Sequence, residues 1–125
     1  MSVVEHESAA DFAETLDRLV KAIESHGMTI FAKIDHAGGA RDVGLAMPPT
    51  VVMLYGNPKG GTPIMLAAPQ AALDLPLRVL VREEGGRVLV SFYPVAEMLK
   101  QAGVSDELAA RLEPAQRIII EAVSR

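Results

Sequence analysis

The chain has 125 residues, 50% of them hydrophobic, and a formal net charge of −4. This length suits one globular domain, residues 1–125, with its own hydrophobic core. The negative charge argues against nucleic-acid binding, because contacts to phosphates need a basic surface. The absence of cysteine excludes disulfides, thiolate catalysis and cysteine-ligated metals. No apolar run approaches the length of a membrane span, so we expect a soluble, cytoplasmic protein that makes no membrane contact.

The first predicted element is a helix. Ser8 begins an S-x-x-D pattern, which predicts a capping box with Asp11 at the third helical position. Gly27 stands where a helix C-terminal cap belongs. Between them, apolar residues recur at helical spacing: Phe12, Leu16, Leu19, Val20 and Ile23.

Three regions then predict strands. The first runs roughly from Met28 to His36, and the second, Val51 to Tyr55, is apolar on both faces and so predicts a central strand. The segment "LRVLVREEGGRVLVSFY" predicts a hairpin with Gly85-Gly86 as its two-residue turn, which pairs Val81 with Val90. The other face of this hairpin is a mixed surface: Arg78, Leu80, Arg82, Leu89 and Tyr93.

Helices are predicted again towards the C-terminus. Pro94 can start one that ends at Gly103, Ser105 caps a short one, and Pro114 begins the last. Strands joined by a hairpin, with helices near both ends of the chain, indicate an α+β fold. We expect an antiparallel sheet of four to five strands with helices packed on one face, in a β-α-β4-α-like order.

The segment "YGNPKGGTPIM", Tyr55–Met65, resembles a phosphate-binding loop only superficially. In a P-loop the lysine follows the glycines, whereas here Lys59 precedes Gly60 and Gly61. A weaker possibility is that Thr62 caps a helix starting at Pro63, so that the glycine N–H groups and Lys59 hold an anion. The favoured alternative is that the glycines only let the chain turn. On that reading Gly61 has a backbone conformation closed to residues with a Cβ.

A few polar residues could carry chemistry. His36, beside Asp35 and before two glycines, could be an acid, a base or a ligand, but a histidine that fixes the turn is favoured. Asp74 is either a cap or a pocket acid, and Asn57 a turn residue or a ligand contact; for both the structural role is favoured. No histidine spacing indicates a metal site, and no catalytic residue is assigned.

Three blocks of sequence resemble the bacterial and archaeal family called "domain of unknown function 302". They are "FAKIDHAGGA" (Phe31–Ala40), "YGNPKGGTPIM" (Tyr55–Met65) and "ALDLPLRVLV" (Ala72–Val81), and the similarity extends over nearly the whole chain. Tyr55 stands where phenylalanine is more often expected. The resemblance implies an α+β domain with a helix-covered antiparallel sheet, a homodimer, and no established activity or cofactor. The matched motif positions are Asp35, His36, Asn57, Pro58, Gly61, Thr62, Pro63, Met65, Asp74, Leu75 and Pro76.

These observations lead to three hypotheses. The leading one is a dimeric, non-enzymatic domain that binds a small or anionic molecule between the Asn57–Thr62 loop and His36. The second is an enzyme that uses His36 and Asp74 as an acid/base pair. The third is a structural or regulatory dimer without a ligand. The predicted ligand-binding residues are His36, Asn57, Lys59, Gly60, Gly61, Thr62 and Asp74.

Overall fold

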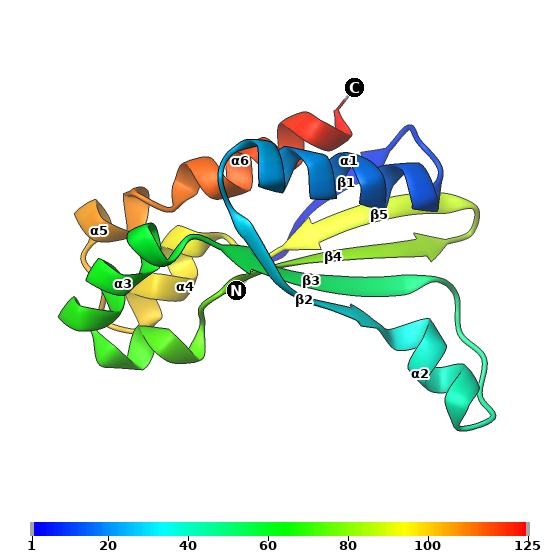
Figure 1. Ribbon diagram of the computed structural model, residues 1–125, viewed down its shortest axis with the longest axis horizontal. Coiled ribbons are helices and arrows are strands. Elements are labelled where there is room, and N and C mark those ends of the chain that lie inside the picture. The colour runs from blue at the N-terminus through cyan, green and yellow to red at the C-terminus, as the bar shows by residue number, and fades with distance from the viewer. Residues whose placement is uncertain (1, 125) are drawn as a thin grey trace.

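The computed structural model describes residues 2–124 (Figure 1). Its strands are β1 (Val4–Ser8), β2 (Thr29–Asp35), β3 (Thr50–Gly56), β4 (Leu77–Glu84) and β5 (Arg87–Phe92). Its helices are α1 (Phe12–Ser25), α2 (His36–Asp42), α3 (Pro58–Ala67), α4 (Val95–Gln101), α5 (Asp106–Ala110) and α6 (Glu113–Val123). A 3-10 helix, η1 (Pro69–Leu73), lies between α3 and β4.

The strands form a single sheet in the order β1-β5-β4-β3-β2, and every neighbouring pair is antiparallel. This confirms the predicted α+β class with an antiparallel sheet. β3 lies inside the sheet, as its apolar sequence predicted, and the hairpin of β4 and β5 pairs Val81 with Val90. The predicted β-α-β4-α-like order includes a strand before the first helix, although no residues were assigned to it; β1 is that strand, and it adds an edge beside β5.

Helices α1 and α6 pack against each other and cover one face of the sheet (Figure 1). Alternation along β3 directs Val51, Met53 and Tyr55 to this face, and all three are buried. Leu19 of α1 and Ile119 of α6 are fully buried against them in the same cluster. The core is therefore the aliphatic layer between the sheet and these two helices.

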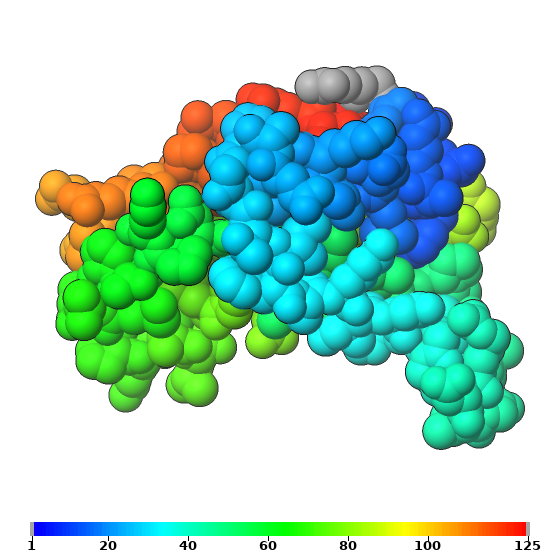
Figure 2. Space-filling view, in the orientation of Figure 1, coloured from blue at the N-terminus to red at the C-terminus, as the bar shows by residue number. Residues whose placement is uncertain are grey.

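The opposite face of the sheet is much less covered. Val52 and Leu80 on this face are half-buried, and Ile34 of β2 is 43% exposed. Helix α2 projects beyond one end of the sheet and α3 lies at the other, and Figure 2 shows the outline of the molecule indented between these two ends. Leu89, which the sequence placed on the mixed hairpin surface, is buried in the structure.

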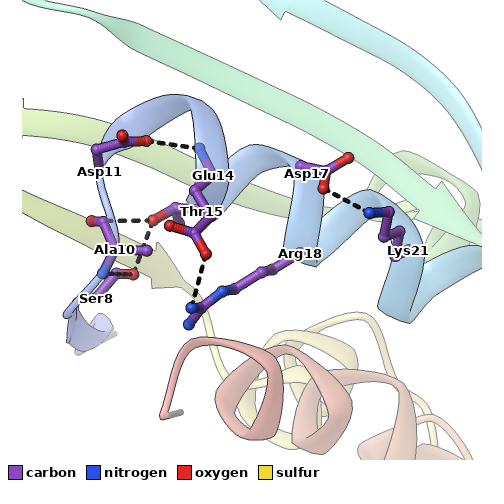
Figure 3. A network of polar contacts seen from close by, with 8 residues as sticks. All are labelled: Ser8, Ala10, Asp11, Glu14, Thr15, Asp17, Arg18 and Lys21. Atoms are coloured by element: carbon purple, nitrogen blue, oxygen red, sulfur yellow. Dashed lines mark hydrogen bonds and ion pairs between the residues drawn. The ribbon is translucent and has the colours of Figure 1, made fainter.

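The start of α1 differs from the prediction. Asp11, not Ser8, is the N-cap, and its carboxylate accepts a hydrogen bond from the Glu14 N–H at 2.8 Å (Figure 3). Ser8 instead ends β1 and points into the core, where its hydroxyl lies 2.7 Å from the Thr15 hydroxyl. The S-x-x-D pattern allows either Ser8 or Asp11 to be the N-cap. The buried hydroxyl pair of Ser8 and Thr15 keeps Ser8 in the core, so Asp11 caps the helix.

Two further element boundaries were predicted wrongly. β2 ends at Asp35, whose side chain caps α2 by accepting from the Gly38 N–H at 2.9 Å, so His36 is the first residue of that helix rather than the end of a strand. The helix predicted to start at Pro63 starts at Pro58, and Asn57 rather than Thr62 is its N-cap. In both cases an Asx residue supplies the cap, Asp35 for α2 and Asn57 for α3.

The C-terminal helices follow the prediction. α4 starts directly after Pro94, and Gly103 has a φ of +84° just beyond its end. Ser105 caps α5 by accepting from the Leu108 N–H at 3.3 Å. Gln116 of α6 was not predicted to matter, yet it is buried and links two elements: its side chain accepts from the Val95 N–H at 2.9 Å and donates to the Tyr93 carbonyl at 2.8 Å.

Candidate functional site

A cavity of about 340 Å³ lies where the end of β3 meets α3 and the α5–α6 junction. We call it the Tyr55 cavity. Its apolar walls are Met28, Phe31, Tyr55, Pro58, Met65, Leu75, Pro76, Leu77, Leu112 and Ala115. Its remaining lining residues are Gly56, Asn57, Gly60, Gly61, Thr62 and Arg111. A mainly apolar concavity with a few polar groups is the usual form of a small-molecule site.

Asn57 fixes the loop that borders this cavity. Its side-chain oxygen accepts from the Lys59 N–H at 3.0 Å, and its carbonyl accepts from the N–H groups of Gly60 and Gly61 at 2.9 and 3.0 Å. The N–H groups that the sequence suggested for an anion are therefore bonded within the first turn of α3. An anion in this cavity needs another partner.

The two glycines form a wall of the cavity rather than a strained turn. Neither Gly60 nor Gly61 has a positive φ, so the expectation of a backbone conformation closed to Cβ at Gly61 is wrong. A Cβ built on Gly61 would lie 3.8 Å from Leu75 Cδ1 and 3.9 Å from Met65 Cε, which is ordinary contact. At Gly60 it would lie 3.3 Å from Leu112 Cδ2, so the lack of a side chain lets α3 approach the α5–α6 junction closely.

Tyr55 holds the floor of the cavity in place. Its ring is fully buried, and its hydroxyl donates a hydrogen bond to the Ala115 carbonyl of α6 at 2.9 Å. Burial raises the pKa of this hydroxyl above its usual range. Tyr55 is therefore a neutral, fixed group that ties β3 to α6, and its proton is already engaged.

Arg111 is the charged residue of the cavity lining. Within residues 2–124, most arginines have a carboxylate within 4.0 Å: Arg18, Arg41, Arg82, Arg87 and Arg117. In the same part of the chain, no carboxylate lies within that distance of Arg111 or Arg78. Each of these two lines a cavity.

Arg78 lines the second cavity, of about 470 Å³, on the less covered face of the sheet. We call it the open-face cavity. His36 and Arg82 also line it, together with apolar residues such as Val52 and Leu80. Arg82 is bound to Glu84 at 3.0 Å and lies 3.7 Å from Glu5.

The predicted site residues are thus divided between places. Asn57, Gly60, Gly61 and Thr62 line the Tyr55 cavity, whereas His36 lines the open-face cavity. Lys59 is exposed and Asp74 follows η1 as its C-cap, and neither belongs to the lining of either cavity. Sequence reasoning missed Tyr55 and Arg111 as site residues, because nothing local in the sequence connects β3 with the α5–α6 junction.

Comparisons with known proteins place this geometry in a family. The family model "Domain of unknown function DUF302" matches residues 4–124. A crystal structure titled as an uncharacterized conserved DUF302 protein from Bacillus stearothermophilus superimposes with a TM-score of 0.85 and 14% identity, over 99% of this chain and 97% of that one. At this identity the likeness shows the fold.

Curated relatives come from Brucella. Proteins named "Fluoride-specific ion channel FluC 1" from Brucella suis biovar 1 and Brucella abortus biovar 1 are 36% identical over 108 residues, which is 84% of this chain. The matched part is 42% and 40% of those proteins, respectively, so the chain spans about two fifths of their length. In the present chain, none of the helices within residues 2–124 is long and apolar enough to cross a membrane.

Proposed function

The chain belongs to the family of the domain of unknown function DUF302. From the geometry above, we propose that it is a single binding domain that holds a compact organic molecule in the Tyr55 cavity. The observation that carries the proposal is the cavity itself, about 340 Å³ with apolar walls. This volume corresponds to about eleven water molecules at roughly 30 Å³ each, so a ligand of about ten non-hydrogen atoms fits.

The position of the cavity supports the same proposal. Its walls come mainly from β3, α3 and the α5–α6 junction, and the Tyr55–Ala115 hydrogen bond joins β3 to α6. A site built on such elements keeps its shape without a ligand. Four of the residues predicted from the sequence, Asn57, Gly60, Gly61 and Thr62, line this cavity.

The enzyme hypothesis has less support. It required His36 and Asp74 to converge on one cavity, but His36 lines the open-face cavity and Asp74 lines neither. General acid/base catalysis needs both groups within hydrogen-bond reach of one substrate. We therefore propose binding rather than catalysis by this pair.

The test uses small probes and a variant that fills the cavity. Benzoate, benzamide, hexanoate and hexanamide are titrated by ligand-observed NMR against the wild type and Gly61→Leu. The control is Gly39→Leu in α2, where a Cβ would meet nothing within 4 Å. Binding of at least one probe that is lost in Gly61→Leu and kept in Gly39→Leu supports the site. No binding by any probe, or binding that Gly61→Leu leaves intact, contradicts it.

The relatives suggest a second candidate function. We propose that the domain acts together with a fluoride-conducting protein, because 36% identity over 108 residues links it to proteins named as fluoride-specific ion channels. The test compares fluoride efflux from liposomes carrying the Brucella suis relative with and without its matched segment, and then adds this chain. Altered efflux that the added chain restores supports the candidate; unchanged efflux, or failure to restore it, contradicts it.

We also propose that the protein is a homodimer joined through the less covered face of its sheet. The support is the apolar row of Ile34, Val52 and Leu80, which pair across β2, β3 and β4 and are not buried within the protomer. A second copy on this face would remove that surface from water.

A further inference from the structure

We infer that the ligand of the Tyr55 cavity is an organic monocarboxylate, bound through the guanidinium group of Arg111. This inference rests on the proposed function, and it adds the charge and chemical class of the ligand. It assigns to Arg111 the role that the sequence suggested for Lys59 and the glycine N–H groups.

The first step is the state of Arg111. It directly follows α5, lines the cavity, and has no carboxylate within 4.0 Å among residues 2–124. Arg117, which lies further along the same region of the chain, has its partner Glu113 at 3.7 Å. A guanidinium beside an apolar cavity, with its hydrogen-bond donors not bound to a carboxylate, is suited to a planar two-oxygen anion.

The second step compares Arg111 with the other donors near the cavity, of which the Thr62 hydroxyl and the Asn57 side-chain NH2 are uncharged. The N–H groups of Lys59, Gly60 and Gly61 are all bound to Asn57. The Tyr55 hydroxyl donates to the Ala115 carbonyl. Arg111 is therefore the group of the lining that can offer positive charge and several donors together.

The third step concerns the rest of the ligand. Apart from Arg111, the lining carries no charged side chain, and Met28, Phe31, Met65 and Leu75 cannot pair with a second charge. A second charged group on the ligand would lie against these side chains without a partner, which is costly. The ligand that fits carries one negative charge and a compact apolar body.

Arg78 in the open-face cavity is comparable to Arg111, but it supports a carboxylate site less well. It lies on the sheet face that we propose for the dimer, where a second copy would itself cover Arg78. The Tyr55 cavity lies away from that surface, at the α3–α5 end of the molecule (Figure 1).

The experiment compares each carboxylate probe with its neutral amide in the wild type, Arg111→Gln, Lys59→Gln and Arg117→Gln. Benzoate and hexanoate should bind about two- to fivefold more tightly than benzamide and hexanamide to the wild type, the range expected for an ion pair with an exposed arginine. Arg111→Gln should remove this preference. Lys59→Gln and Arg117→Gln should retain it.

The outcomes separate this inference from the proposed function. Equal binding of acid and amide, or a preference that survives in Arg111→Gln, overturns the monocarboxylate assignment while the cavity remains a binding site. A preference lost in Lys59→Gln but not in Arg111→Gln also overturns it, since the anion would then lie outside the cavity. No binding by any probe contradicts both.

Discussion

Tyr55 joins the fold and the proposed site at the scale of a single side chain. Its ring forms part of the cavity wall, and its hydroxyl binds the Ala115 carbonyl across the core. The sequence analysis drew attention to the segment that starts at Tyr55 because of its glycines, not because of the tyrosine. The partner of the tyrosine is 60 residues away, so local pattern could not reveal it.

We predict that Tyr55→Phe lowers the free energy of unfolding at pH 7 by about 1 kcal/mol, because it removes one buried hydrogen bond. Burial raises the folded-state pKa of Tyr55 above the value of 10.0 of a free tyrosine. The folded state therefore holds this proton more tightly than the unfolded state does. The contribution of Tyr55 to stability is fully present below pH 10 and falls as the pH rises further.

Urea unfolding between pH 8 and pH 11 measures this effect. Above pH 10 the wild type should lose up to about 1.4 kcal/mol per pH unit more than Tyr55→Phe. Tyr93→Phe is the control, because Tyr93 is 51% exposed. Identical pH dependence in the wild type and Tyr55→Phe would show that the buried hydroxyl does not control this loss.

A second residue-scale prediction concerns Gly61. Because it lies inside α3 without a positive φ and has room for a Cβ, Gly61→Ala should leave stability unchanged or raise it by up to about 1 kcal/mol. Gly39→Ala in α2 is the matched control. Thermal melts check both, and a loss of more than about 1 kcal/mol in Gly61→Ala alone would restore the strained-turn interpretation.

At the scale of elements, Gln116 connects the end of β5 to the start of α4. We predict that Gln116→Leu lowers the free energy of unfolding by about 1–3 kcal/mol, because the Val95 N–H and the Tyr93 carbonyl both lose their side-chain partner. Gln101→Leu, at the exposed end of α4, should cost little. Urea unfolding of both decides, and equal stability of the two variants would be the contrary result.

At this scale, the elements with strong apolar periodicity could be predicted from the sequence, whereas the residues that cap the helices could not always be. The central strand, the hairpin and the C-terminal helices follow from apolar spacing and from Gly85-Gly86, Pro94 and Ser105. The first strand of the predicted order was not assigned to residues, because the five residues of β1 alternate between charged and apolar or polar types without a turn signal. The starts of α1 and α3 were misplaced because two cap-forming residues stand close together in each case, Ser8 with Asp11 and Asn57 with Thr62, and the sequence alone does not choose between them.

The candidate site was predictable only in part for a related reason. One sequence motif contains four of the lining residues, so they could be predicted together: Asn57, Gly60, Gly61 and Thr62. His36 and Asp74 belong to the other two motif blocks: His36 lines the open-face cavity, and Asp74 directly precedes the lining residue Leu75 without itself lining the Tyr55 cavity. Arg111 carries no local signal at all, since its proposed role depends on the α5–α6 junction lying beside α3 rather than on its neighbours in the chain.

At the scale of the whole molecule, the less covered sheet face predicts a homodimer. Light scattering at micromolar concentration should give twice the mass of the 13.3 kDa chain. Ile34→Glu, on the open face, should shift the protein towards monomer by placing charge in the interface. Ala13→Glu on α1, which covers the other face, should remain dimeric. A wild-type monomer, or equal effects of the two variants, would refute this interface.

The most direct test of the binding site is a map of backbone amide NMR shifts during titration with benzoate. We expect the changes to centre on the residues around the Tyr55 cavity, including Gly60, Gly61 and Arg111. They should saturate with one dissociation constant. Shifts centred on His36 and Arg78 instead, or no saturable shifts at all, would contradict the assignment of this cavity as the binding site of the domain.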